Sequence, residues 1–408
     1  MTGEVHLFDW SRFRFIVTIT GMTMTETTTT GGEATAFVPW AAELGAQIAK
    51  YAAQHDRDGT FVGEAFDLFK SSGYLALAVP RELGGHGATI RQVSYAQREL
   101  AKHCGSSALA VSMHHHVTLF TAWRYRRGLP GAEATLRRVA DDCIVLVSTG
   151  GADFTRPRGV ATPCEGGYRV SGRKVFASQV PMGDVFSTMF VLDDGGDTDE
   201  RVILNMAVPV AVDGVTVLDN WDTLGMRGTG SHDVEIDSVF VPEDKVLARR
   251  PYGVVDPPLQ VIISNAFPVI GAVYLGVAEA ARAAAVAAVA GTPRAEDPSV
   301  QRQVGLMDNR LRVMAWALDG ALATIGDDPQ PSVENVVAAM AAKREISIGG
   351  IEVCDLAMEV AGGAAYFRTS PIERCYRDVR GAKFHPFTPE QTLIHAGKVS
   401  LGLPADEM

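Results

Sequence analysis

Residues 221–244, WDTLGMRGTGSHDVEIDSVFVPED, are the stretch that decides the fold of this chain. It opens with a polar turn that contains Gly225, Gly228 and Gly230, and apolar and charged residues then alternate across 234–241. Alternation of this kind places one face of a β-strand on a core and the other face in water. Glycines ahead of such a strand let the backbone approach a flat or anionic ligand, or they form a glycine-rich hairpin within a β-domain. The segment by itself leaves both interpretations open.

One further segment precedes this stretch and another follows it: SGRKVFAS at 171–178 and AGGAAYFRTSPIERCYRDVR at 361–380. Together the three segments resemble the acyl-CoA dehydrogenase family. The first is similar to the family's strand beneath the flavin, and 221–244 is similar to the end of its middle β-domain. The last resembles its double-glycine turn, which is followed by a helix and an arginine–aspartate pair. The resemblance extends over residues 39–402, and the shared order is a stronger sign than any single motif.

The resemblance implies an α+β fold with three parts, and the apolar periodicity agrees with it. We expect a disordered N-terminal extension at 1–35, an N-terminal helical domain at 36–142, a middle β-barrel or sandwich domain at 143–250, and a C-terminal antiparallel helix bundle at 251–408. In the middle part the period falls from 3.6 towards 2. The strands expected there are 143–149, 168–177, 185–192, 202–208, 215–218 and 234–241.

Composition excludes several classes of protein. The formal net charge of −11, without any run of lysine and arginine, argues against a nucleic-acid partner. No run of eighteen apolar residues predicts a membrane-spanning helix. The five cysteines form no C-x-x-C pair, which indicates reduced thiols in a cytoplasmic protein and no metal site. TETTTTGGEAT near the N-terminus resembles a disordered spacer, and we expect the true translation start at Met22 or Met24.

Three consecutive histidines, His114 to His116, fall on an expected helix. Neighbouring residues on a helix point about 100° apart, so the three rings cannot converge on one metal ion. We expect one of them to face the core or a ligand pocket and the others to be solvated.

The resemblance implies FAD as cofactor and assigns residues to it. Phe176 is expected against the isoalloxazine ring, and the Ser178 hydroxyl is expected to hydrogen-bond flavin N5. Ser148 corresponds to a threonine that binds the pyrimidine side, and Gly150 and Gly151 supply a close backbone approach. The residues alone also permit a strand with a core phenylalanine and an exposed serine.

The double glycine, Gly362 and Gly363, corresponds to the turn that approaches the FAD of a neighbouring subunit, although it also fits a helix C-cap. The resemblance therefore implies a homo-oligomer, which we expect to be a homotetramer.

At the position of the catalytic base the sequence departs from the family's pattern. Eight residues after Asp378, where the family's commonest pattern has its glutamate, the chain has Pro386. Glu390 is the nearest candidate base, with Thr392 standing where the family has a threonine at the cofactor. Glu390 also follows Pro389, so it equally fits an acid at a helix N-terminus. The alternative base position of the family falls on Ala266, which has no carboxylate.

These features permit two enzymatic interpretations and one non-enzymatic interpretation. The first is an FAD-dependent dehydrogenase that oxidises an acyl-CoA thioester in fatty acid metabolism, with Glu390 as base and an electron acceptor flavoprotein as partner. The second is a monooxygenase of the same fold that uses oxygen and reduced flavin from a flavin reductase; His385 or Ser178 would then steer the oxygen. The third is a non-catalytic member of the family. The sequence favours the dehydrogenase.

Overall fold

The computed structural model describes residues 31–193, 195 and 201–406. The expected starts at Met22 and Met24 lie outside these residues. So does the extension at 1–35, apart from its last five residues, which include the short helix α1 (Gly31–Ala34) in place of disorder.

The N-terminal part is helical, as expected. One end of α4 shows why: Thr89 accepts a hydrogen bond from the Gln92 amide, and the Gln92 side chain accepts one from the Thr89 amide, which closes a capping box. Nearly every residue of α5 is buried, so this helix has apolar residues on all sides. The helices that follow α1 are α2 (Val38–Asp58), α3 (Gly63–Ser72), α4 (Ile90–His103), α5 (Gly105–Arg126) and α6 (Ala132–Asp141).

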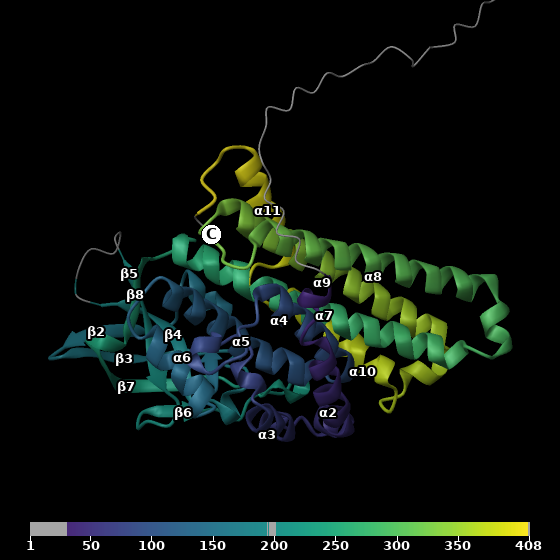
Figure 1. The fold of residues 1–408 in the computed structure, drawn as a ribbon, viewed down its shortest axis with the longest axis horizontal. Coiled ribbons are helices and arrows are strands. Elements are labelled where there is room, and N and C mark those ends of the chain that lie inside the picture. The colour runs from purple at the N-terminus through teal and green to yellow at the C-terminus, as the bar shows by residue number, and fades with distance from the viewer. Residues whose placement is uncertain (1–30, 194, 196–200, 407–408) are drawn as a thin grey trace, which may run out of the picture.

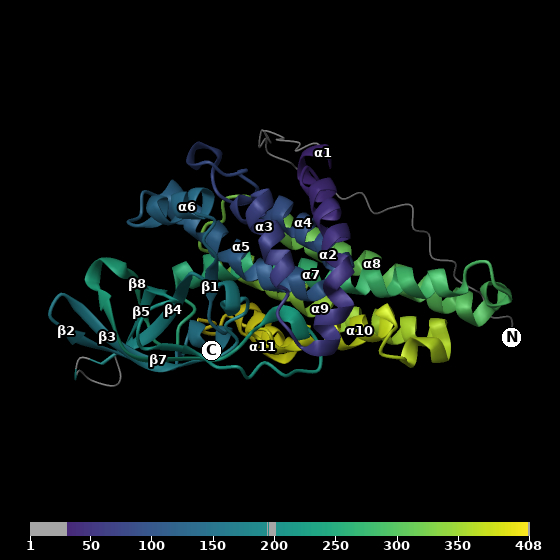
Figure 2. The same ribbon diagram turned by 90° about the horizontal axis from the view of Figure 1, so that it is seen from below.

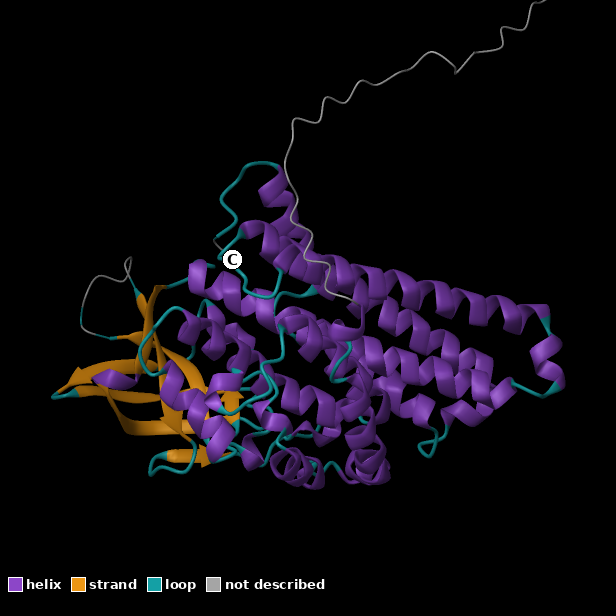
Figure 3. Cartoon of the chain, in the orientation of Figure 1, coloured by secondary structure: helices purple, strands orange, loops and turns teal. Residues whose placement is uncertain are grey.

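The middle part forms one sheet, whose eight strands within the described residues lie at one end of the molecule (Figure 3). The order is β6-β7-β3-β2-β4-β5-β8, and β1 pairs with β4. Strands at opposite sides of the sheet share one core, in which Phe190 and Leu204 meet Ile236, so the sheet curls around that core. The strands are β1 (Leu146–Ser148), β2 (Val160–Cys164), β3 (Gly167–Lys174), β4 (Val185–Leu192), β5 (Val202–Pro209), β6 (Val215–Val217), β7 (Val234–Pro242) and β8 (Val246–Pro251).

The alternating stretch forms β7, and its alternation has one interruption. Val234 and Ile236 point into the core, but Asp237 and Ser238 are both exposed before Val239 turns inward again. Ser238 has a φ of 53°, and the pairing with β3 shifts at this point. A β-bulge of this kind keeps the second half of the strand facing the core.

The C-terminal part is the expected bundle of long helices. Figure 2 shows it extending away from the sheet. Its first helix, α7, packs against α4 and α5 of the N-terminal part as well as α9. An 18-residue window of α7 has a mean hydropathy of 1.9, enough for a membrane span, but that window is completely buried in the fold, as in the core helix of a globular protein. The helices are α7 (Pro257–Val289), α8 (Pro298–Ile325), α9 (Val333–Ala361), α10 (Pro371–Asp378) and α11 (Pro389–Ser400).

Candidate functional site

A pocket of about 370 Å³ lies where the three parts of the chain meet. Its walls come from α5, the first half of α7, the loops after β1 and β3, and the segments 221–231 and 377–386. Most of the lining is apolar. Among the described residues that line it, none is aspartate or glutamate.

The glycines that precede β7 fit the loop against the rest of the protein. A Cβ atom on Gly225 would lie 2.3 Å from the Arg377 carbonyl oxygen, and one on Gly228 would lie 2.8 Å from the Val62 side chain. Gly230 adopts a φ of +53° with Phe61 beside it. The close backbone approach that the sequence suggested is therefore made to the connection between α2 and α3 and to α10 of this chain.

Polar contacts fix the same loop from both sides. The Arg377 guanidinium forms a bidentate ion pair with Asp56 of α2, at 2.8 and 2.6 Å, and donates to the Leu224 carbonyl at 3.0 Å. The Met226 amide donates to the Asp378 carboxylate. Burial raises the pKa of Asp378 to about 6, although this hydrogen bond opposes the shift. The loop is thus held rigidly where it borders the pocket.

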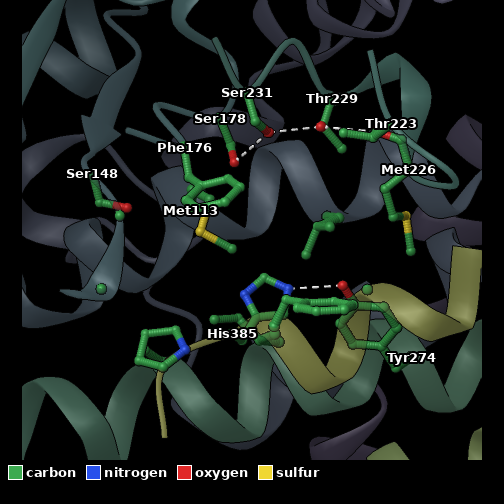
Figure 4. A pocket seen from close by; sticks show the side chains of 18 of the residues that line it. Met113, Ser148, Phe176, Ser178, Thr223, Met226, Thr229, Ser231, Tyr274 and His385 are labelled. Atoms are coloured by element: carbon green, nitrogen blue, oxygen red, sulfur yellow. Dashed lines mark hydrogen bonds between the residues drawn. The ribbon is translucent and has the colours of Figure 1, made fainter. Parts of the chain in front are cut away.

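Phe176 and Ser178 form one face of the pocket (Figure 4). Phe176 has a φ of 55°, and its ring is 54% exposed and meets Trp221 edge-to-face, with 6.0 Å between ring centroids. The Ser178 hydroxyl lies 2.7 Å from the hydroxyl of Ser231, which lies 2.7 Å from that of Thr229. An exposed aromatic ring beside a fixed hydroxyl suits a flat heteroaromatic group.

Ser148, Gly150 and Gly151 border the same space. The Ser148 hydroxyl is 3.1 Å from His116 Nε2. A Cβ atom on Gly150 would lie 2.6 Å from the Val175 carbonyl oxygen, and one on Gly151 would overlap the Pro386 ring at 1.7 Å. Both glycines are therefore required by close packing against this chain's own residues at the edge of the pocket.

The three histidines on α5 point to three different surroundings and all are buried, so the expectation that two are solvated was wrong. His114 accepts from the Leu146 amide at 3.0 Å and donates to the Leu75 carbonyl at 2.8 Å. His115 packs edge-on against Tyr74. His116 lines the pocket, and burial lowers its pKa to about 4. Within the described residues no group of histidine, cysteine and acidic side chains is arranged to hold a metal ion.

His385 and Tyr274 lie across the pocket from Ser178 (Figure 4). The Tyr274 hydroxyl and His385 Nε2 share a hydrogen bond of 2.7 Å. Burial, followed by the charges of Lys343 and His116, lowers the pKa of His385 to about 3, and burial raises the pKa of Tyr274 well above its usual value. Both groups are therefore neutral at pH 7.

Lys343 of α9 supports this wall from behind. Its ammonium donates to the carbonyls of Phe387 at 2.7 Å and His385 at 3.3 Å. Phe387 has a φ of 56°, a strained conformation that must be held by its surroundings. Burial lowers the pKa of Lys343 to about 8.

The other residues predicted for the site lie elsewhere in this single chain. Glu390 is exposed in the first turn of α11, beside a capping box made by Thr388 and Gln391, and it does not line the pocket. Thr392 is buried and donates to the Pro389 carbonyl at 2.6 Å. Gly362, with a φ of 71°, ends α9.

Gly363, which follows Gly362, has open space around it, so whether this turn serves a neighbouring subunit stays a prediction. Six of the ten residues that the sequence predicted for the site thus meet at the pocket, namely Ser148, Gly150, Gly151, Phe176, Ser178 and His385. Sequence reasoning missed Trp221, Thr229, Ser231 and Tyr274, although the first three lie in or beside the glycine-rich loop that it singled out.

Comparisons with known proteins agree with this architecture. Three domain descriptions match in order: "Acyl-CoA dehydrogenase, N-terminal domain" at 39–125, the middle domain at 148–239 and the C-terminal domain at 268–390. The chain is similar to L-evernosamine nitrososynthase of a Micromonospora species, with 34% identity over 384 residues that cover 88% of each chain. It is 30% identical to amino sugar nitrososynthase DnmZ of Streptomyces peucetius over 374 residues, which cover 85% of this chain and 88% of DnmZ.

A solved structure of similar fold contains both a flavin and a sugar nucleotide. It is KijD3 in complex with FMN and dTDP-3-amino-2,3,6-trideoxy-4-keto-3-methyl-D-glucose. The TM-score is 0.81 at 28% identity, and the match covers 93% of this chain and 96% of KijD3.

Proposed function

The chain belongs to the acyl-CoA dehydrogenase family as a flavin-dependent oxidoreductase, and we propose that it is a monooxygenase that uses reduced FMN and oxygen to oxidise the amino group of a nucleotide-linked amino sugar. The sequence favoured an acyl-CoA dehydrogenase. We propose instead the flavin-dependent monooxygenase that the sequence analysis gave as its alternative. FMN takes the place of FAD because KijD3, a neighbour in fold, binds FMN. The nitrososynthase relatives support an amino sugar as the substrate class.

The observation that carries the proposal is the pocket without a carboxylate. Dehydrogenation of an acyl thioester requires a base within hydrogen-bond reach of the proton that it removes. Glu390 is exposed and outside the pocket, and no described lining residue is acidic. Oxygen transfer to an amine needs no such base.

The same electrostatics favour a neutral amine. No described lining residue is acidic, so the lining offers no anion to pair with an ammonium group, and His116 and His385 are uncharged at pH 7. Burial without an anionic partner lowers the pKa of a basic amine, as it does for Lys343 in the adjoining wall. A substrate amine would therefore lose its proton on entry and present the nitrogen lone pair that reacts with an electrophilic oxygen.

The described residues suggest how the substrate would be held. Phe176 and Ser178 would carry the flavin ring on one side, and His385 and Tyr274 would face it from the other. His385, in the neutral tautomer whose Nε2–H donates to the Tyr274 oxygen, would accept a hydrogen bond from the amine N–H at Nδ1 and orient the amine lone pair towards the flavin side. Apolar residues such as Met113 would exclude water from the space between. Positioning of this kind is the main contribution that a protein makes to cofactor chemistry.

Reduced flavin, when bound, would supply the two electrons and two protons with which dioxygen places one atom on the nitrogen and releases the other as water. The products are then a hydroxylamine, oxidised FMN and water. A separate flavin reductase would provide FMNH2. A homotetramer in the cytoplasm remains part of the proposal, and the free cysteines agree with that compartment.

The test combines the purified protein with a flavin reductase, NADH, FMN and a dTDP-linked 3-amino sugar in isotope-labelled oxygen. We expect a hydroxylamine or nitroso product that carries the labelled atom, detected by mass spectrometry. Anaerobic mixing of the protein–FAD or protein–FMN mixture with acyl-CoA thioesters should leave the flavin colour unchanged. Bleaching by a thioester, without an oxygenated amine product, would establish the dehydrogenase instead.

A further inference from the structure

The mouth of the pocket is marked by three exposed side chains. Among the described residues that line the pocket, only Phe176, Leu224 and Phe384 are exposed, by 54%, 61% and 80%. Deeper lining residues such as Met113 and Phe267 are buried and apolar. Phe176 is assigned to the flavin ring, so Leu224 and Phe384 are the exposed apolar side chains that a substrate meets at the entrance.

Arg377 and Arg380 are the two arginines among the described residues that line the pocket, and they differ in their partners. Every nitrogen of the Arg377 guanidinium is engaged, by Asp56 and Glu373 at 2.6–2.8 Å. Nη2 of Arg380 donates to Asp355 at 2.8 Å, and the remaining N–H groups of that guanidinium have no partner in the described part of the chain. The side chains of this second pair are 28% and 48% exposed, so water screens their attraction and an anion can compete with Asp355.

The size of the pocket limits what it can enclose. Its volume of about 370 Å³ is at the small end of the roughly 300–1,000 Å³ that is usual for sites of drug-sized ligands. The isoalloxazine ring and an amino sugar would share this space, so the nucleotide of a nucleotide-linked sugar has to lie at the mouth. A diphosphate placed deeper would be an anion in an apolar interior without a free cation, which is costly.

The two groups that a nucleotide requires stand together at this mouth. Arg380 and Phe384 belong to one 3-10 helix (Val379–Phe384). The Arg380 guanidinium lies over the Tyr376 ring, 4.2 Å from its centroid, and this cation–π contact holds it in place. A planar guanidinium donates in parallel to phosphate oxygens, and an exposed aromatic ring stacks on the face of a base.

We infer that Arg380 and Phe384 form a nucleoside-diphosphate subsite at the mouth of the pocket, in which Arg380 pairs with the diphosphate and Phe384 stacks on the base. The inference rests on the proposed function, because it starts from a substrate that is linked to a nucleotide. A diphosphate held at the mouth directs the attached sugar inward, towards the neutral wall that contains His385.

The first experiment measures binding of dTDP, which carries a base and a diphosphate but no amine, by calorimetric titration of the purified protein. Arg380→Gln should raise the dissociation constant about tenfold or more, because charge-assisted hydrogen bonds are lost. It should also remove most of the weakening by added salt that we expect for the wild type. Phe384→Ala should raise the dissociation constant about tenfold through lost stacking and should keep the salt dependence.

Two matched controls change the same residue types outside the pocket. Lys383→Gln removes an exposed cation beside Arg380, and Phe367→Ala removes an aromatic ring that is 67% exposed. Neither residue lines the pocket, so both variants should bind dTDP within about twofold of the wild type.

The second experiment measures oxygenation of a dTDP-linked 3-amino sugar. Arg380→Gln and Phe384→Ala should raise KM about tenfold and leave kcat within about twofold of the wild type. The reason is that the nucleotide does not react, so its contacts contribute equally to the bound substrate and to the transition state.

Three outcomes overturn the inference and leave the monooxygenase intact. The first is a dTDP dissociation constant that neither Arg380→Gln nor Phe384→Ala changes. The second is competitive displacement of dTDP by FMN, since Arg380 would then hold the flavin phosphate. The third is dissociation of an oligomer by Phe384→Ala without weaker dTDP binding, since the ring would then be a subunit contact. Binding of dTDP that responds to both variants, without any oxygenated amine, instead supports the subsite and overturns the proposed function.

Discussion

Lys343→Met tests the electrostatics of the wall that holds His385. Lys343 is only 3% exposed, and its ammonium donates to two main-chain carbonyls, those of His385 and Phe387, rather than to a carboxylate. A buried ammonium without an anionic partner is costly. Methionine keeps much of the length of the side chain and removes the charge together with the two hydrogen bonds.

The magnitude follows from the pKa of Lys343. Burial lowers it from its usual 10.5 to about 8. At 1.36 kcal/mol for each pKa unit, the charged form costs about 3 kcal/mol of folding free energy at neutral pH. Because the unfolded chain binds this proton more tightly than the folded chain, the penalty is fully present below pH 8 and is lost as pH rises towards 10.5. Between pH 7 and about pH 9.5 the free energy of unfolding of the wild type should therefore rise by about 2 kcal/mol relative to that of the variant.

Urea unfolding at these two pH values measures the effect. At pH 7 the two lost hydrogen bonds and the relieved burial of charge should nearly cancel, so the two proteins should differ by about 1 kcal/mol or less. Near pH 9.5 the variant should be the less stable by about 2 kcal/mol. Lys50→Met, at an exposed position of α2, controls for the loss of a lysine. A difference between wild type and Lys343→Met that stays constant with pH would refute the reasoning.

Three further predictions concern the site and its supports. Glu390→Gln should change the rate of amine oxygenation by no more than about twofold, because Glu390 is exposed and outside the pocket; a loss of a hundredfold in a product assay would restore it as the base. His385→Phe should lower product formed for each NADH consumed, and kcat/KM by at least about 10²-fold, since the acceptor for the amine N–H is lost; full coupling would contradict that role. Asp56→Asn should lower the free energy of unfolding by about 3 kcal/mol in urea, because it breaks a buried ion pair with Arg377, and a loss below about 1 kcal/mol would show that Glu373 alone satisfies the arginine.

The sequence predicted those helices and strands that have a recognisable local pattern of residue types. Residues 185–192 are rich in β-branched and aromatic residues, and they form β4 with the expected bounds. Strands β2 and β8 were missed: β2 buries only Ala161, and Arg250 of β8 is buried by an ion pair with Asp256, a contact that no local pattern displays.

The residues of the site also differ in whether a local sequence pattern could identify them. Phe176 and Ser178 were found because the segment 171–178 is recognisable in the sequence, although β3 ends at Lys174 and both residues lie in the loop after it. Tyr274 reads in the sequence as one more apolar residue of a core helix, and it reaches the pocket only because α7 packs against α5. Glu390 looked like a base because an acid at a helix N-terminus and an acid in an active site leave the same trace in a sequence.

The fit of the loop 221–231 limits how such proteins can recombine. Its glycines touch Val62 and Phe61 on one side and the Arg377 backbone on the other. A gene fusion that exchanged the β-domain alone would bring a foreign loop against surfaces of α10 and of the α2–α3 connection that did not evolve with it. Chimeras between homologues should therefore fold only when these three surfaces come from the same parent, even though each stands far from the others along the chain.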